Sequence, residues 1–196
     1  SEADSRIVGA ETDDRVGYAL ASVGDLNEDG YGDLFIGAWG DDTNGSFAGA
    51  AWIVHGPMDA DVDLAEEGIV FYGEKAGDNA GTAVSSAGDI NDDGWIDLLI
   101  GAPNYDPGGA ISTGAVYVLH GPHTEELELD RADAFLMGEA TADYAGQRVE
   151  GAGDLDGDGI DDLIIAAWGN DTGGSAAGAV YLVNGPVLGE KLLADA

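Results

Sequence analysis

Three short loops, each rich in Asp and Gly, hold the residue types in this chain that are best suited to chemistry. In each loop a carboxylate or amide side chain occupies positions 1, 3, 5 and 9, and glycine occupies position 6. Alternate side chains of a tight loop can point at one centre, and Ca²⁺ takes about six to eight oxygen ligands in a flexible shell. The spacing therefore predicts one calcium site per loop, with a backbone carbonyl from position 7 as a further ligand.

The expected ligands come from positions 1, 3, 5, 7 and 9 of each loop. They are Asp25, Asn27, Asp29, Tyr31 and Asp33 in the first loop, Asp89, Asn91, Asp93, Trp95 and Asp97 in the second, and Asp154, Asp156, Asp158, Ile160 and Asp162 in the third. Position 7 contributes only its carbonyl, so its side chain is free to vary. The glycine at position 6 permits the sharp turn that wraps the backbone around an ion. We expect three Ca²⁺ ions as cofactors and no catalytic residues.

The first half of each loop matches an EF-hand, but the second half does not. An EF-hand carries Glu at position 12 between two helices, whereas this position is Ile36, Ile100 or Ile165 and the flanking segments have strand character. The plainer alternative is that the loops are three ordinary Asp-Gly turns with surface acids. The same residue types at positions 1, 3, 5 and 9 of all three repeats make this alternative less favourable. Mg²⁺ fits less well than Ca²⁺, because it keeps its waters and demands a stricter octahedron.

The loops belong to three repeats that cover the single region 1–196, at about residues 3–67, 68–132 and 133–196. Each repeat holds short segments that are apolar or rich in β-branched and aromatic residues, and none has the period of a long amphipathic helix. In the second repeat these segments are residues 69–72, 82–87, 98–100 and 116–119. Four short strands per repeat predict an all-β fold made of β-propeller blades, each of four antiparallel strands.

The phase of the repeats makes the assembly an open question. Residues 5–8 align with the fourth strand of the first blade, residues 69–72, and the third blade lacks its outer strand. The N-terminal segment is therefore suited to serve as the outer strand of a last blade, in the same chain or in a neighbour. Three blades are fewer than the about four to eight that close a ring. We expect a homo-oligomer, in which two arcs give six blades, or a part of a longer repeat chain.

Charge and composition exclude several functions. The chain has 39 Asp and Glu against 6 Lys and Arg, which gives a formal charge of −33. The phosphate backbone of a nucleic acid is also negatively charged and binds basic surfaces, so it would be repelled. No apolar run approaches the about 18 residues of a membrane-spanning helix. With three His, no Cys and no Ser-His-Asp spacing, nothing indicates a zinc site or an activated nucleophile. We therefore expect no nucleic-acid binding, no membrane span and no enzymatic activity.

The repeats resemble the FG-GAP repeats of the integrin α-subunit N-terminal β-propeller and its bacterial relatives. Gly17, Gly81 and Gly146 match the glycine of the family's Phe-Gly pair, although its Phe is replaced. The Gly-Ala-Pro that follows the calcium loop is complete at 101–103, whereas 37–39 is Gly-Ala-Trp and 166–168 is Ala-Ala-Trp. The resemblance implies structural calcium in the loops between the first two strands of each blade, on the face opposite the one that meets ligands.

The expected function is that of a non-catalytic, secreted, extracellular or cell-surface module for adhesion or protein–protein interaction, with a protein or glycan ligand. A carbohydrate-binding propeller lectin is the first alternative, in which Trp39 and Trp168 stack on sugar instead of packing between blades. An accessory domain of a secreted hydrolase is the second. His55 and His120 share one repeat position before a Gly-Pro pair, where turn residues are the simpler interpretation.

Overall fold

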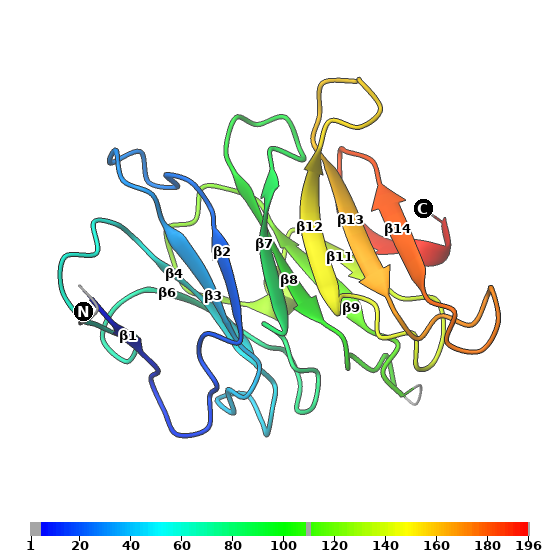
Figure 1. Cartoon of the computed structure of the whole chain (residues 1–196), viewed down its shortest axis with the longest axis horizontal. Helices are drawn as coiled ribbons and strands as arrows, with labels where there is room; N and C mark the ends of the chain where they lie inside the picture. Colours follow the sequence, from blue (N-terminus) through cyan, green and yellow to red (C-terminus); the bar gives the residue numbers. More distant parts are fainter. Residues whose placement is uncertain (1–4, 109–110, 196) are drawn as a thin grey trace.

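The computed structural model describes residues 5–108 and 111–195, and it shows an arc of β-sheets that stand one beside the next (Figure 1). The prediction of an all-β fold with propeller-type blades is confirmed. Two of the sheets have the strand orders β10-β6-β4-β3-β2 and β15-β11-β9-β8-β7, and a third sheet has the order β12-β13-β14. We call the antiparallel strands of these sheets blades 1, 2 and 3.

The blades repeat the same sequence of strands. Blade 1 consists of β2 (Ala19–Ser22), β3 (Leu34–Ala38), β4 (Ala50–Val54) and β6 (Ile69–Tyr72). Blade 2 consists of β7 (Ala83–Gly88), β8 (Asp97–Ala102), β9 (Ala115–Leu119) and β11 (Ala134–Met137). Blade 3 consists of β12 (Arg148–Gly153), β13 (Asp162–Ala167) and β14 (Ala179–Val183), and the described residues place no fourth strand beside β14.

The segment after the third strand of each blade adds a parallel strand to the preceding sheet. These segments contain β5 (Val62–Asp63), β10 (Leu127–Glu128) and β15 (Gly189–Leu192), and the short 3-10 turns η1 (Leu129–Arg131) and η2 (Leu193–Asp195) follow the last two. Strand β10 pairs with β6, and β15 pairs with β11. Both 3-10 turns are far too short to cross a bilayer, and the described part of the chain has no membrane-spanning helix.

Strand β1 (Ile7–Val8) pairs in parallel with β5, and its register is the one that β6 and β11 adopt against their own partners. Ile7 faces Val62, just as Phe71 faces Leu127. Strand β1 therefore holds the place of a fourth strand that would belong to a blade before blade 1. It lies at the opposite end of the arc from β14 (Figure 1).

The core consists of the layers between neighbouring blades. In β8, Leu98 belongs to the apolar cluster shared with blade 1, whereas the adjacent Leu99 belongs to the cluster shared with blade 3. Successive residues of a strand point to opposite faces. A strand buried on both faces therefore needs an uninterrupted apolar run, which is the pattern that the sequence shows at 98–100.

Glycines set the spacing between the blades. A Cβ added at Gly37 would overlap the carbonyl oxygen of Gly81, and a Cβ at Gly101 would overlap that of Gly146. The first glycine of Gly-Ala-Pro thus packs against the glycine of the Phe-Gly position in the next blade. Gly81 and Gly146 themselves adopt φ of +80° and +85°, which L side chains rarely adopt. This contact explains why glycine occurs both at the Phe-Gly position of one blade and at the first position of Gly-Ala-Pro in the blade before it.

The replacement Gly101→Ala tests this close approach. The new methyl group has no free space against a backbone oxygen, so we expect the variant to lose about 1–3 kcal/mol of unfolding free energy, as overpacked cores do. Urea unfolding followed by circular dichroism measures the loss. Gly32→Ala is the matched control, because its Cβ would meet the nearest atom at an ordinary 3.9 Å. Equal stability of the two variants would contradict the contact.

Candidate metal centre

The three Asp-rich loops lie on one edge of the arc. They join β2 to β3, β7 to β8 and β12 to β13, and all three stand at the upper edge in Figure 1. The loops that begin with Trp39 and Trp168 join the second strand to the third and lie at the opposite edge. The strands of each blade therefore hold the two sets of loops a full strand length apart.

The backbone follows the same path in the three loops. Position 4 is left-handed in each, with φ of 59° at Glu28, 60° at Asp92 and 84° at Gly157. The glycine at position 6 is left-handed as well, with φ of 91°, 91° and 99°. A positive φ at a residue other than glycine is uncommon. The left-handed conformation recurs at position 4 of every loop, so the three loops form one kind of turn.

Side-chain oxygens point into each loop and accept its backbone N–H groups. The two carboxylate oxygens of Asp25 accept hydrogen bonds from the N–H groups of Asp29 and Gly30, at 3.0 and 2.8 Å. Asp89 does the same at 3.0 and 2.8 Å, and Asp154 at 3.1 and 3.0 Å. The carboxylate at position 5 accepts the N–H of position 7 at 2.9 Å in every loop. This arrangement gathers the oxygens of positions 1, 3 and 5 around the turn.

The third loop brings three acidic side chains within reach of one cation. Asp154, Asp156 and Asp162 each offer a carboxylate oxygen, and these oxygens lie within 4.8 Å of one another. Ligands of one Ca²⁺ at about 2.4 Å lie at most about 4.8 Å apart, so this separation fits a common ion. Asp158, the predicted ligand at position 5, is outside the group. In the first two loops position 3 is Asn27 or Asn91, so an all-acid group of this kind does not form there.

Position 9 has a structural role that sequence reasoning missed. Asp33, Asp97 and Asp162 are buried, and each accepts two backbone N–H groups. One donor is the residue at position 2 of the loop, and the other is the glycine of the Gly-Pro pair that follows the third strand. For Asp97 the donors are Ile90 at 3.0 Å and Gly121 at 2.9 Å. The repeated Gly-Pro pair was the available signal in the sequence. Every residue other than proline has a backbone N–H, however, so residue type alone does not identify the donor.

Burial of Asp97 has an electrostatic consequence. Loss of hydration raises the pKa of this carboxyl above its usual value, while the N–H groups of Gly121 and Ile90 and the nearby His120 oppose the rise. The two N–H donors thus stabilise a charge that burial disfavours. His55 is the counterpart of His120 in blade 1, and its Nδ1 lies 3.2 Å from Asp33 Oδ2, without hydrogen-bonding geometry. His120 Nε2 contacts the carbonyl oxygen of Val187 at 3.0 Å.

Asp161 links two of the loops, and no sequence pattern indicated it. Its carboxylate accepts the N–H of Asp89 at 2.9 Å, and its own N–H contacts the carbonyl of Asp89 at 3.3 Å. Asp161 stands at position 8 of the third loop, where the other loops have Gly32 and Ile96. Because position 8 varies in type, its role becomes visible only when neighbouring blades are stacked.

The two Trp side chains pack against aromatic rings of their own repeat. Trp39 meets Tyr18 edge-on at 5.9 Å and Phe47 at 5.7 Å, with the guanidinium of Arg15 4.8 Å from its ring centre. Trp168 is exposed and stacks on Tyr144 at 4.8 Å.

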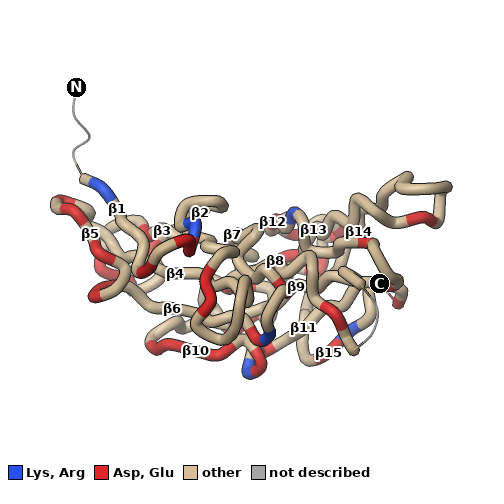
Figure 2. Tube along the Cα trace, turned by 90° about the horizontal axis from the view of Figure 1, so that it is seen from below, with Lys and Arg blue, Asp and Glu red and all other residues tan. Residues whose placement is uncertain are grey.

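Acidic residues extend well beyond these loops. Figure 2 shows them along the whole arc, in the loops and connecting segments of all three blades, with few basic residues between them. The formal charge of −33 is therefore distributed over all three blades, well beyond the three Asp-rich loops.

Comparison with known proteins agrees with this architecture. The family model for the FG-GAP repeat matches residues 80–119 and 145–183, which cover the first three strands of blades 2 and 3 with their Asp-rich loops. The chain is 33% identical over 173 residues to phosphatidylinositol-glycan-specific phospholipase D of Rattus norvegicus, covering 85% of this chain. It is 31% identical over 160 residues to integrin alpha-5 of Xenopus laevis, covering 80% of this chain.

These matches define the class of the protein: the chain contains FG-GAP repeats, detected at residues 80–119 and 145–183. More particularly, it is similar to integrin α chains, including integrin alpha pat-2 of Caenorhabditis briggsae at 29% identity over 184 residues. The chain spans 20% of the length of the rat phospholipase, 15% of the Xenopus integrin and 14% of the C. briggsae integrin. The resemblance predicted from the loop and glycine patterns is confirmed.

The hydrogen bonds accepted by the aspartate at position 9 lead to a prediction in the absence of calcium. Asp97→Ala leaves the buried N–H groups of Ile90 and Gly121 without acceptors, at about 1–3 kcal/mol each. We expect the variant to lose about 3 kcal/mol or more of unfolding free energy in EDTA. Asp93→Ala, which removes an exposed carboxylate of the same loop, should lose about 1 kcal/mol or less. Urea titrations compare the two, and equal losses would mean that position 9 acts through metal ligation alone.

Proposed function

We propose that this chain is a non-catalytic FG-GAP propeller module whose three loops each bind one structural Ca²⁺. The observation that carries the proposal is the common form of the loops, together with the three convergent carboxylates of the third. A chain of three repeats, about residues 3–67, 68–132 and 133–196, would thus hold three ions.

The proposed ligands are the side chains at positions 1, 3, 5 and 9 and the carbonyl at position 7. In the third loop they are Asp154, Asp156, Asp158, the carbonyl of Ile160 and Asp162. A carboxylate oxygen that accepts one N–H retains a lone pair, so the hydrogen bonds of Asp162 to Leu155 and Gly185 leave room for a cation. An ion in this position joins the loop to the turn after the third strand. It also relieves repulsion between neighbouring carboxylates, about 1 kcal/mol per pair in water.

The module is proposed to act by binding and not by catalysis. The carboxylates of the loops already hold their own backbone, which suits a rigid structural site. The relatives include a phospholipase D by name, but the chain matches a fifth of its length. We therefore propose that the chain serves adhesion or protein–protein interaction outside the cell or at the cell surface, as the similarity to integrin α chains favours. Its partner would be a protein or a glycan.

One observation favours a second candidate, carbohydrate binding. The exposed, parallel stack of Trp168 on Tyr144 presents a flat aromatic surface of the kind on which sugar rings pack. A glycan array with the intact chain tests this function. Loss of a glycan signal in Trp168→Ala, with unchanged circular dichroism, would favour a lectin, and absence of any signal in the parent chain would exclude the tested sugars.

Removal of calcium should destabilise the fold. An ion that binds only the folded state stabilises it by about 2.7 kcal/mol per site at about 100 times Kd. For a chain of this size that corresponds to about 5–10 °C in melting temperature per site. Scanning calorimetry with EDTA and with added Ca²⁺ measures the shift, and Mg²⁺ should produce a smaller one. Identical melting temperatures in EDTA and Ca²⁺ would contradict structural calcium.

Ion counting separates the three loops. Asp154→Ala removes a carboxylate that accepts two loop N–H groups and faces the proposed ion, so we expect bound calcium to fall from three ions per chain to two. Isothermal titration calorimetry or atomic emission after dialysis gives the count. Asp59→Asn, which alters an exposed acid outside the loops, is the control and should retain three ions. An unchanged count in Asp154→Ala would refute ligation in the third loop.

A further inference from the structure

The start of the second Asp-rich loop is held by the third loop, which belongs to the next blade. Asp161 accepts the backbone N–H of Asp89 through its carboxylate at 2.9 Å, and its own N–H donates to the carbonyl oxygen of Asp89 at 3.3 Å. Asp89 is position 1 of the second loop, and Asp161 is position 8 of the third. The first residue of the second loop thus has both of its backbone polar groups bonded to one residue of another loop.

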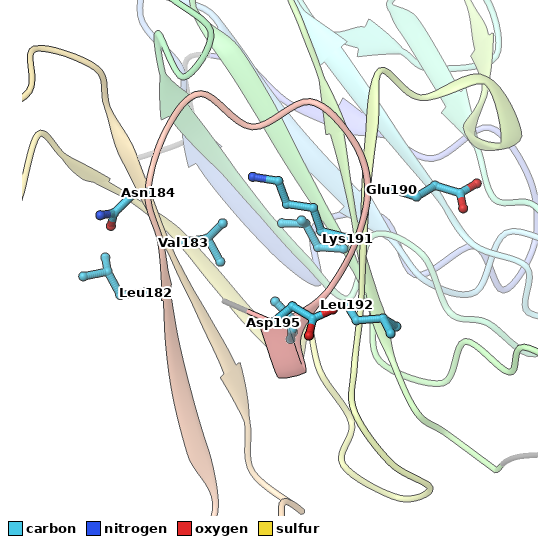
Figure 3. Close-up of a pocket in the computed structure, with 9 residues that line it drawn as sticks. Leu182, Val183, Asn184, Glu190, Lys191, Leu192 and Asp195 are labelled. Atoms are coloured by element: carbon cyan, nitrogen blue, oxygen red, sulfur yellow. The ribbon is translucent and has the colours of Figure 1, made fainter.

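A third hydrogen bond reaches the same place from the turn that joins β14 to β15 (Figure 3). The buried Val187 of this turn donates its N–H to the carbonyl oxygen of Ile90, position 2 of the second loop, at 3.1 Å. The turn is also bonded to the third loop, because the N–H of Gly185 donates to Asp162 at 3.1 Å. Asp162 is therefore next to Asp161 in the chain and hydrogen-bonded to the turn, so two routes lead from position 9 of the third loop to the second loop.

Gly88 permits the close approach of Asp161. This glycine adopts φ of +77°, and a Cβ added to it would overlap the carboxylate of Asp161. Any larger residue would push the carboxylate away from the N–H of Asp89, which is the next residue in the chain. The hydrogen bond between the two loops therefore requires a glycine at this position.

The first and second loops meet through an apolar contact instead. Position 8 of the second loop is Ile96, and a Cβ on Gly24 would lie 3.1 Å from its Cδ1. An isoleucine side chain offers no acceptor, and within residues 5–108 and 111–195 no hydrogen bond joins Ile96 to Asp25, position 1 of the first loop. The chain thus contains one hydrogen-bonded pair of loops and one pair without such a bond, which serves as an internal comparison.

We propose that Asp161 is a positioning residue for the second loop and couples the second calcium site to the third, so that an ion bound in either site raises the affinity of the other. The first site binds its ion independently. This inference rests on the proposed function, in which each loop holds one structural Ca²⁺.

The coupling arises from order that the two loops share. An ion in the third loop would fix Asp162 and the carbonyl of Ile160, the two chain neighbours of Asp161, and with them the residue that holds Asp89. A ligand that orders a shared segment removes that entropy cost for the next ligand, which gives positive cooperativity. The effect is reciprocal, because a coupling free energy between two binding sites acts equally in both directions.

Trp95 allows occupancy of the second loop to be observed by itself. Tb³⁺ takes the oxygen ligands of Ca²⁺ sites, and it luminesces when a nearby indole transfers excitation energy to it. Trp95 stands at position 7, where the other loops have Tyr31 and Ile160. Of the other Trp side chains, Trp39 and Trp168 begin loops at the opposite edge of the arc, and Trp52 is buried within β4. Luminescence excited through Trp therefore reports the second loop, with Trp95→Phe as the background.

Titration of the intact chain with Tb³⁺ is the first test. Asp161→Ala should weaken binding in the second loop about five- to tenfold, within the range typical of couplings between sites. Asp161→Asn keeps a carbonyl acceptor for the N–H of Asp89 and should stay within about twofold of the parent chain. Glu190→Ala removes an exposed acid of the same repeat in β15, outside the loops (Figure 3), and should leave the affinity unchanged.

Asp154→Ala tests the coupling itself. This variant lacks a proposed ligand of the third loop, so the second loop should again bind Tb³⁺ about five- to tenfold more weakly. Asp161→Ala should add little to this loss, because the two changes act through the same route. With the probe moved to the first loop by Tyr31→Trp in the Trp95→Phe background, neither change should alter the affinity.

The possible results separate the coupling from calcium binding. The coupling would be overturned, with the calcium sites intact, by equal affinity of the second loop in the parent and Asp161→Ala, or by an Asp161→Asn variant as weak as Asp161→Ala. Tighter binding in Asp154→Ala, which repulsion between two ions would produce, would overturn it as well. A parent chain whose signal does not exceed that of Trp95→Phe would contradict calcium binding in the second loop, and the coupling with it.

Discussion

The packing of one blade face on the next is the constraint on which the structure depends. A four-stranded blade has two apolar faces and cannot bury either alone, so Leu98 and Leu99 of one strand are buried in different layers. The contact is close enough that Gly37 and Gly101 have no space for a side chain against the next blade. The stacking places the three Asp-rich loops side by side at one edge of the arc. Val180 of β14 and Leu20 of β2 lie at the ends of the described arc and are exposed, which shows the same surfaces without a neighbour.

The aspartate at position 9 connects this packing to the loops. Asp33, Asp97 and Asp162 are buried at the start of the second strand, and each joins its loop to the Gly-Pro turn through two backbone donors. The loop is thus held in shape by its own chain before a cation is considered. The proposed cation, bound at the same point, would add a further link between segments that are already in contact.

Sequence reasoning predicted the fold and the form of the loops well, because both depend on residue type at fixed spacing. Alternate acids, a glycine at position 6 and apolar runs such as 98–100 are visible in the chain. The remaining features depend on backbone groups and on neighbours. The N–H groups of Gly56 and Gly121 that satisfy position 9, and the contact of Asp161 with Asp89, become apparent only when the blades are assembled. The exclusion of Asp158 from the convergent acids of the third loop is likewise visible only in the structure.

The parallel strands between blades have a consequence for how the molecule unfolds. Because β10 is hydrogen-bonded to β6 and β15 to β11, the connecting segment of each repeat belongs to the sheet of the repeat before it. In linear repeat proteins the coupling between neighbours comes from side-chain contacts at their interface. Here, separation of two repeats also breaks main-chain hydrogen bonds, which raises the coupling relative to the intrinsic stability of one repeat. The arc should therefore melt as a single cooperative unit rather than fray repeat by repeat from its ends.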